Sequence, residues 1–144
     1  MLNLEPTSRL VLPAPISTNA LYRNVKGVGR VQTTDYQAWK RLASQTLSAQ
    51  HPLPRFALPV ELTFYVGEVG VGQMDSDNTL KALTDALVKA KVIPDDKRKH
   101  VRRTAAEWVP DMAGCVVVIE PAQEPARAAE IVQAVRPGLR ELLR

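Results

Sequence analysis

The chain has 144 residues, a formal net charge of +4 and a hydrophobic content of 45%. This is the length of one domain with a proper core, and the composition is that of a globular protein. A single cysteine, Cys115, excludes a disulfide framework and a cysteine-rich zinc site. No apolar run approaches a membrane span and the first residues lack a signal-peptide pattern, so we expect no membrane partner and a cytoplasmic location.

The first third of the chain predicts a strand, a loop and a helix. Residues 8–12 predict a strand that ends at two prolines, and residues 16–33 predict a long polar loop. A helix is expected to begin near Thr34, whose spacing to Gln37 fits a capping box, and to end before Pro52. The side chains expected on its buried face are Trp39, Leu42, Ala43, Thr46 and Leu47.

The middle of the chain predicts three more strands and a second helix. Residues 60–66 alternate between apolar and polar side chains, which indicates a strand with one solvent-facing side. A short helix is expected at about 78–91, and strands at 99–109 and 114–120. The connection between these last two strands resembles that of a hairpin, and Cys115 is expected to be buried in the last strand. The element order is therefore β-α-β-α-β-β, an α+β arrangement.

The chain continues beyond the last strand into an alanine-rich tail. Residues 126–136 predict a helix that Pro137 and Gly138 interrupt. We therefore divide the chain into a domain at 1–120 and a helical extension at 121–144.

Acidic residues and one lysine surround the second predicted helix. Asp75 and Asp77 precede it, Lys81 follows Asp77 by one helical turn, and Asp95 and Asp96 come after the helix end. We expect Asp75, Asp77 and Asp96 to lie close together, where oxygen ligands suit Mg²⁺ or Mn²⁺. Singly, each has a simpler interpretation: a helix cap for Asp77 or Asn78, and a solvated turn for the Asp95–Asp96 pair.

Two basic segments flank the acidic one. The first lies in the predicted 16–33 loop and the second begins directly after Asp96; their members are Arg23, Lys26 and Arg30, then Lys97, Arg98 and Lys99. Basic residues beside an acidic metal site are what a phosphodiester substrate requires. Tyr22 is either a DNA contact or a packed anchor of its loop, and His51 and His100 are expected at the surface.

These motifs resemble the RusA family of Holliday junction resolvases, small dimeric endonucleases often carried by phages and prophages. The resemblance covers about residues 8–120. The segments that carry it are Pro15–Asn19, Tyr22-Arg23, Asp75-Ser-Asp77-Asn78-Thr-Leu-Lys81, Asp85-Ala-Leu87 and Asp95-Asp96. It implies a small mixed four-stranded sheet with two helices packed on it, followed here by the extra C-terminal helical tail.

The resemblance also implies an activity and its residues. Asp75, Asp77 and Asp96 match the family's catalytic and metal-binding carboxylates, and Lys81 matches its catalytic lysine. Asn19 and Asn78 match recurring polar positions, and Asn19 is grouped with the expected DNA-binding residues. The implied protein is a homodimer that uses Mg²⁺ or Mn²⁺ to resolve four-way DNA junctions in recombination and repair.

Two other functions stay open from the sequence alone. One is a catalytically silent protein that binds DNA junctions through its basic surface. The other is a different Asp-x-Asp metal enzyme acting on phosphoesters, such as a sugar-nucleotide transferase or a small-molecule phosphatase.

Overall fold

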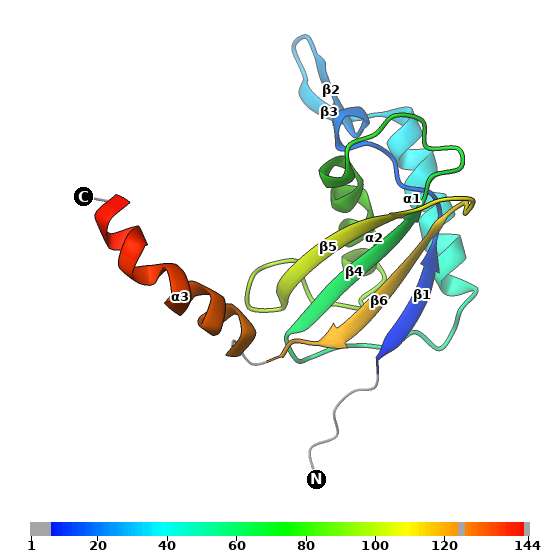
Figure 1. Ribbon diagram of the computed structural model, residues 1–144. Helices are drawn as coiled ribbons and strands as arrows, with labels where there is room; N and C mark the ends of the chain where they lie inside the picture. The colour runs from blue at the N-terminus through cyan, green and yellow to red at the C-terminus, as the bar shows by residue number, and fades with distance from the viewer. Residues whose placement is uncertain (1–6, 124–125, 143–144) are drawn as a thin grey trace.

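The computed structural model describes residues 7–123 and 126–142, which form strands, two short 3-10 helices and three α-helices (Figure 1). In chain order the elements are β1 (Ser8–Leu12), η1 (Thr18–Ala20), β2 (Tyr22–Val25), β3 (Gly29–Gln32), α1 (Thr34–Ser48), β4 (Val60–Gly67), η2 (Ser76–Thr79), α2 (Leu80–Lys89), β5 (Val101–Val109), β6 (Cys115–Pro121) and α3 (Ala126–Leu142). Within these residues, no helix is both long enough and apolar enough to cross a membrane.

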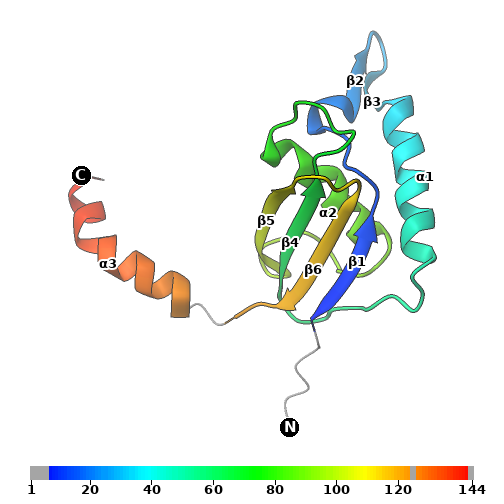
Figure 2. The ribbon, with the colours of Figure 1, turned by 45° about the vertical axis from the view of Figure 1, so that its right-hand side comes forward.

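A four-stranded mixed sheet organises the fold and confirms the α+β prediction. Its strand order is β1-β6-β4-β5, with β4 and β5 parallel and the other neighbours antiparallel. Helices α1 and α2 lie on the same side of this sheet (Figures 1 and 2). Its other face therefore carries no helix of the 7–123 region.

The core lies between the sheet and these two helices. The inward side chains of β4, such as Leu62 and Phe64, are fully buried, and Leu83 and Leu87 of α2 meet them in one apolar cluster. Cys115 is buried in β6 as expected, and this burial raises the pKa of its thiol to about 12. The alternation of apolar and polar side chains along β4 therefore predicted correctly which face of the strand is buried.

Helix α1 packs through a narrower stripe than predicted. Its buried residues are Tyr36, Trp39, Ala43 and Leu47, whereas Leu42 is half exposed and was wrongly assigned to the core. The Trp39 indole Nε1 donates to the carbonyl oxygen of Ala14 at 2.6 Å, which fixes the helix against the chain that leaves β1. The helix is capped by the hydroxyl of Thr33, one residue before the expected position.

The prediction of a long loop at 16–33 is wrong. Residues 18–20 form η1, and β2 and β3 pair as an antiparallel hairpin that stands at the top of Figure 1. Gly27 and Gly29 take φ values of +79° and +99° at its turn, a conformation that glycine adopts without strain. The hairpin also gains a contact between its strands, because the Arg30 guanidinium lies 4.1 Å from the centroid of the Tyr22 ring.

The expected hairpin connection between the last two strands of the sheet is also wrong. Strands β5 and β6 do not pair with each other but flank β4 on its two sides. The chain between them crosses the end of β4, where the Gly67 amide donates to the Gly114 carbonyl at 2.8 Å. A side chain at Gly67 would collide with the Met112 backbone carbonyl, so the crossing requires glycine there.

The tail forms a longer helix than predicted. Helix α3 runs from Ala126 to Leu142 and continues through Pro137, which was expected to interrupt it. It stands apart from the sheet in both ribbon views (Figures 1 and 2), and Ile131, Val135 and Leu142 are exposed. The division of the chain at residue 120 stays a prediction.

Candidate functional site

Three segments far apart in sequence meet at one end of α2. Helix η2 lies directly before α2, and η1 and β5 both contact η2. The Thr18 hydroxyl donates to the Asn78 carbonyl at 3.0 Å, which joins the η1 segment to the start of α2. This junction brings η1, which contains Asn19, against η2, which contains Asp77 and Asn78.

Lys81 lies between two carboxylates from different parts of the chain. Its Nζ is 3.1 Å from Asp85 Oδ1, one helical turn onward, and 3.9 Å from Asp96 Oδ2 in the loop that precedes β5. The hydrogen bond to Asp85 raises the pKa of Lys81, and the charges of Asp85 and Asp96 add to this against a lowering by burial. The ammonium is therefore charged at neutral pH and about half exposed, available to a negatively charged ligand.

Asp85 has a role that sequence reasoning missed. Its second oxygen, Oδ2, accepts from the Tyr36 hydroxyl at 3.5 Å, so one carboxylate connects Lys81 to α1. Burial, with the nearby charge of Asp85, raises the pKa of Tyr36 to about 12, which keeps this phenol protonated. The spacing of four residues between Lys81 and Asp85 was the available signal for an ion pair along the helix.

The two neighbouring aspartates after α2 have different surroundings. Asp95 Oδ1 accepts from the Lys97 backbone amide at 2.9 Å and lies 2.7 Å from His100 Nδ1. The contact with His100 holds the pKa of Asp95 below its usual range. Asp96 is exposed and directed to Lys81 instead. His100, expected at the surface, is partly buried in this turn and paired.

Asp75 and Asp77 present their carboxylates to solvent. Both are exposed, and neither carboxylate has a hydrogen bond or ion pair with any residue that the structure describes. Asp75 stands at the N-cap position of η2 without a side-chain capping bond, and the Asn78 amide bonds to its backbone carbonyl. Helix capping therefore does not account for these two side chains.

The donor set suits a hard divalent cation by its chemistry, since it consists of carboxylate oxygens. The arrangement of these oxygens does not suit a metal ion as it stands. Among residues 7–123 and 126–142, no three His, Cys, Asp or Glu side chains form a group that could hold one. The expectation that Asp75, Asp77 and Asp96 already lie together as one group is not met. Lys81 instead supplies the positive charge nearest to Asp96.

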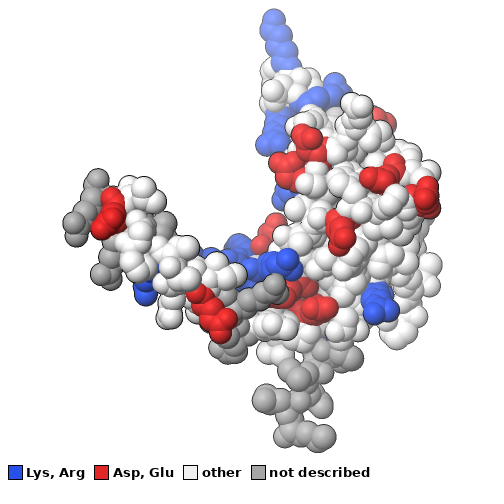
Figure 3. Space-filling model, in the orientation of Figure 1, with Lys and Arg blue, Asp and Glu red and all other residues white. Residues whose placement is uncertain are grey.

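Basic side chains lie on both sides of these carboxylates. Arg23, Lys26 and Arg30 are exposed on the β2–β3 hairpin, and Lys97, Arg98 and Lys99 are exposed in the turn before β5. Figure 3 shows the Lys and Arg side chains over the hairpin, with acidic side chains gathered directly below it. Tyr22 is half-buried at the hairpin base, with its ring edge-on to Tyr36 at 6.0 Å, so it packs as an anchor.

A family model for the endodeoxyribonuclease RusA matches residues 13–120. The chain belongs to the RusA endodeoxyribonuclease family. All the RusA site residues named above lie inside the matched region, whereas α3 lies outside it. Membership identifies the chain in general terms as a Holliday junction endodeoxyribonuclease of recombination and repair. No individually curated protein matches the sequence significantly.

The Asp95–His100 contact predicts a specific dependence of stability on pH. A carboxyl group whose pKa is depressed by folding stabilises the folded state above its unfolded pKa of about 3.9, and this stabilisation is lost as the pH falls through the folded pKa. Asp95→Asn should therefore be less stable than the wild type at pH 5–6, by a difference that shrinks as the pH falls below about 4.

Urea unfolding from pH 2 to 6 measures this difference, with Glu68→Gln as a control that removes an exposed carboxylate elsewhere. A difference between Asp95→Asn and wild type that stays constant across this range would show that the Asp95 charge does not stabilise the turn.

Proposed function

We propose that this protein is a metal-dependent endonuclease that resolves four-way DNA junctions by symmetric phosphodiester hydrolysis, with Mg²⁺ or Mn²⁺ as its cofactor. The observation that carries the proposal is the placement of exposed carboxylates and a charged lysine between two basic segments. Acidic side chains beside a polyanion are costly unless they hold a cation, because like charges repel. A basic surround with an acidic centre is therefore the pattern expected of phosphodiester hydrolysis.

We assign the cation to Asp75, Asp77 and Asp96. When bound there, it would supply a hydroxide nucleophile at neutral pH and offset the charge that develops on the phosphate. Because the three carboxylates do not form one group in the structure, loading requires them to approach one another. Asp96 lies in a turn and Asp75 precedes a short 3-10 helix, so the approach involves segments outside the buried core.

Lys81 and Asp85 act as a pair in this proposal. The Lys81 ammonium contacts the substrate phosphate as a point charge, and Asp85 keeps it protonated and fixes its direction. Asp85 is thus a positioning residue that acts through Lys81. Tyr36 restrains Asp85 in turn from α1.

The two alternative functions explain the same surface less well. A catalytically silent DNA-binding protein gains nothing from Asp75 and Asp77, which face solvent between basic segments and cap no helix. A nucleotide-sugar or small-molecule phosphoester enzyme needs an enclosed substrate pocket around its carboxylates. Asp75, Asp77 and Asp96 are instead exposed, which suits a large substrate that covers them.

We also propose that the protein acts as a two-fold dimer. A four-way junction offers two strands of like polarity, whereas one chain has a single acidic site. The uncovered face of the sheet, with the half-buried side chains Tyr65, Val116 and Val118, offers a surface for the second copy. Sedimentation equilibrium should give twice the mass of one chain, and a single-chain mass at concentrations that cut both strands would contradict the dimer.

The proposed activity predicts a ranking of substrates. With Mg²⁺, the protein should introduce paired nicks in a labelled four-way junction, cut a linear duplex of the same sequence far more slowly, and leave a nucleotide sugar intact. Binding of the junction without cutting in Mg²⁺ or Mn²⁺ would favour the silent binding protein. Turnover of the nucleotide sugar would favour the other phosphoester enzyme.

The hairpin predicts a change in the salt dependence of DNA binding. Replacing Arg23 and Lys26 by Ala should lower the slope of log Kd against log salt by about 0.9 for each lost phosphate contact, about 1.8 together. Arg30 is left in place because it packs on Tyr22. The control replaces Arg55 and Arg136, two exposed basic residues outside both basic segments. Equal slopes for the hairpin variant and the wild type would show that the hairpin does not contact phosphates.

A further inference from the structure

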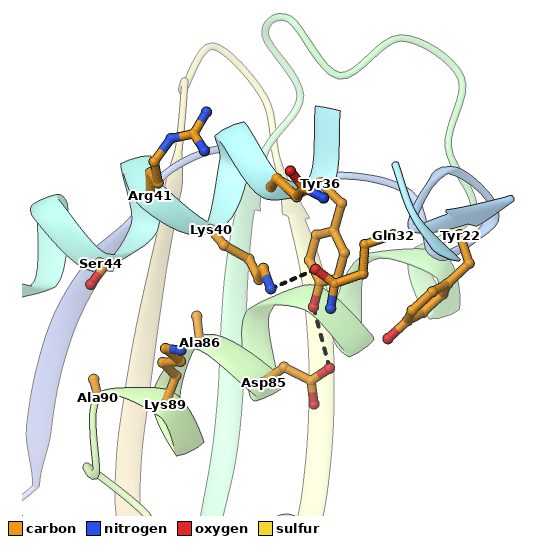
Figure 4. Close-up of a pocket in the computed structure, with 11 residues that line it drawn as sticks. Tyr22, Gln32, Tyr36, Lys40, Arg41, Ser44, Asp85, Ala86, Lys89 and Ala90 are labelled. Atoms are coloured by element: carbon orange, nitrogen blue, oxygen red, sulfur yellow. Dashed lines mark hydrogen bonds between the residues drawn. The ribbon is translucent and has the colours of Figure 1, made fainter. Parts of the chain in front are cut away.

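A groove of about 600 Å³ runs between α1 and α2 and ends at the base of the β2–β3 hairpin (Figure 4). Asp75, Asp77, Lys81 and Asp96 do not line it. The groove exists because small side chains face it from both helices: Ser44 from α1, and Ala86 and Ala90 from α2. The longer side chains that surround these are almost all polar.

The lining is strongly positive. Lys40 and Arg41 come from α1 and Lys89 from α2, whereas Asp85 is the one acidic residue among the described residues that line the groove. Both Asp85 oxygens already have partners, Lys81 on one side and Tyr36 on the other. The groove therefore offers an excess of positive charge without a matching acidic group.

Two of these cations have no partner within the residues that the structure describes. Arg41 and Lys89 are exposed and make no ion pair or side-chain hydrogen bond there. Lys40 differs, since its Nζ donates to Gln32 Oε1 at 2.7 Å and lies 5.1 Å from the centroid of the Tyr36 ring. Figure 4 shows Lys40 reaching from α1 toward Gln32 and Tyr36 at the hairpin end of the groove.

The groove adjoins the candidate site through Asp85. Oδ1 of this carboxylate faces Lys81, and Oδ2 faces Tyr36, which lines the groove. Asp85 therefore contacts Lys81 on one side and lines the groove on the other, so Lys81 and the groove are adjacent. A DNA strand carries one phosphate at each nucleotide, so a single strand can contact Lys81 and the groove cations at the same time.

We propose that the groove between α1 and α2 binds the sugar–phosphate backbone of the DNA strand that continues from the phosphate held at Lys81. Arg41 and Lys89 contact its phosphates from the two helices, and Gln37 and Ser44 donate hydrogen bonds to it. This inference rests on the proposed function, because the strand is the nuclease substrate. A second phosphate-binding surface, separate from the hairpin, fixes the direction in which the strand leaves the site.

Charge-matched double variants test the groove. Arg41→Gln with Lys89→Gln should weaken junction binding and lower the slope of log Kd against log salt by about 1.8, the value for two lost phosphate contacts. Arg55→Gln with Arg136→Gln removes the same charge elsewhere and should keep the wild-type slope. Binding is measured in EDTA, so that neither cleavage nor metal loading enters the result.

The outcomes separate this inference from the proposed function. In one outcome, the groove variant keeps the wild-type Kd and slope while the hairpin variant loses affinity. That result overturns the proposal that the groove binds DNA, and it leaves the proposed nuclease function standing. A wild-type protein that neither binds nor cuts a junction overturns the nuclease and, with it, the groove. An equal loss of slope in the Arg55 and Arg136 control overturns the groove by showing that the effect is one of net charge.

Disulfide trapping gives a second and more direct reading. Ser44→Cys places a thiol in the groove, and the native Cys115 is buried and does not compete. Junctions with a thiol tethered to one phosphate, a few nucleotides from the crossover, should cross-link to this variant. Leu58→Cys, exposed in the segment before β4 and outside the groove, both basic segments and the proposed dimer face, is the control. Equal trapping at both positions, or trapping only at Leu58→Cys, overturns the proposal.

Discussion

The parallel pairing of β4 with β5 is the constraint on which the site depends. Two parallel neighbours cannot be joined by a tight turn, so the chain must cross over one face of the sheet between them. Here the crossover consists of η2, α2 and the turn at 94–100. The acidic and lysine residues of the site all belong to this one crossover. The exposed ion pairs of Lys81 contribute little to stability, but they bring the turn back to the start of α2.

Stability and function are separated in this fold. The core is formed by β1, β4, β6 and the inner faces of α1 and α2, and its residues are mostly apolar. The charged groups lie outside it, where water screens their repulsion and where a large polyanion can reach them. Tyr36 links the core to the charged site, since it is buried against Trp39 and holds Asp85 through its hydroxyl. Chemistry can therefore depend on exposed turns without weakening the core.

Sequence patterns predicted the elements whose residues alternate or repeat toward one core. Strand β4 and the apolar stripe of α2 are examples, because burial on one face leaves a period in the sequence. The motif around Asp75, Asp77 and Lys81 was visible because those residues are close in sequence. The β2–β3 hairpin was missed because its strands are only four residues long and none of their residues is fully buried, so no apolar alternation marks them.

Other errors came from contacts between segments distant in sequence. Nothing in residues 110–114 shows that β4 lies between β5 and β6, because strand order depends on pairing across the whole sheet. The pairing of His100 with Asp95, the second contact of Asp85 and the groove between α1 and α2 arise only when helices and turns meet. Pro137 was taken as a helix end from its own chemistry, but the helix accommodates it.

The carboxylate assignments are tested most directly by comparing two adjacent residues. Junction cleavage in Mg²⁺ is measured for Asp95→Asn and Asp96→Asn, beside Asp75→Asn and Asp77→Asn. Asp95→Asn should remain active, because an amide oxygen can still accept from the Lys97 amide, whereas the other three should lose cleavage by orders of magnitude. Loss of cutting in Asp95→Asn with an active Asp96→Asn would contradict the assignment of the third carboxylate. Cutting by all four variants would contradict the site itself.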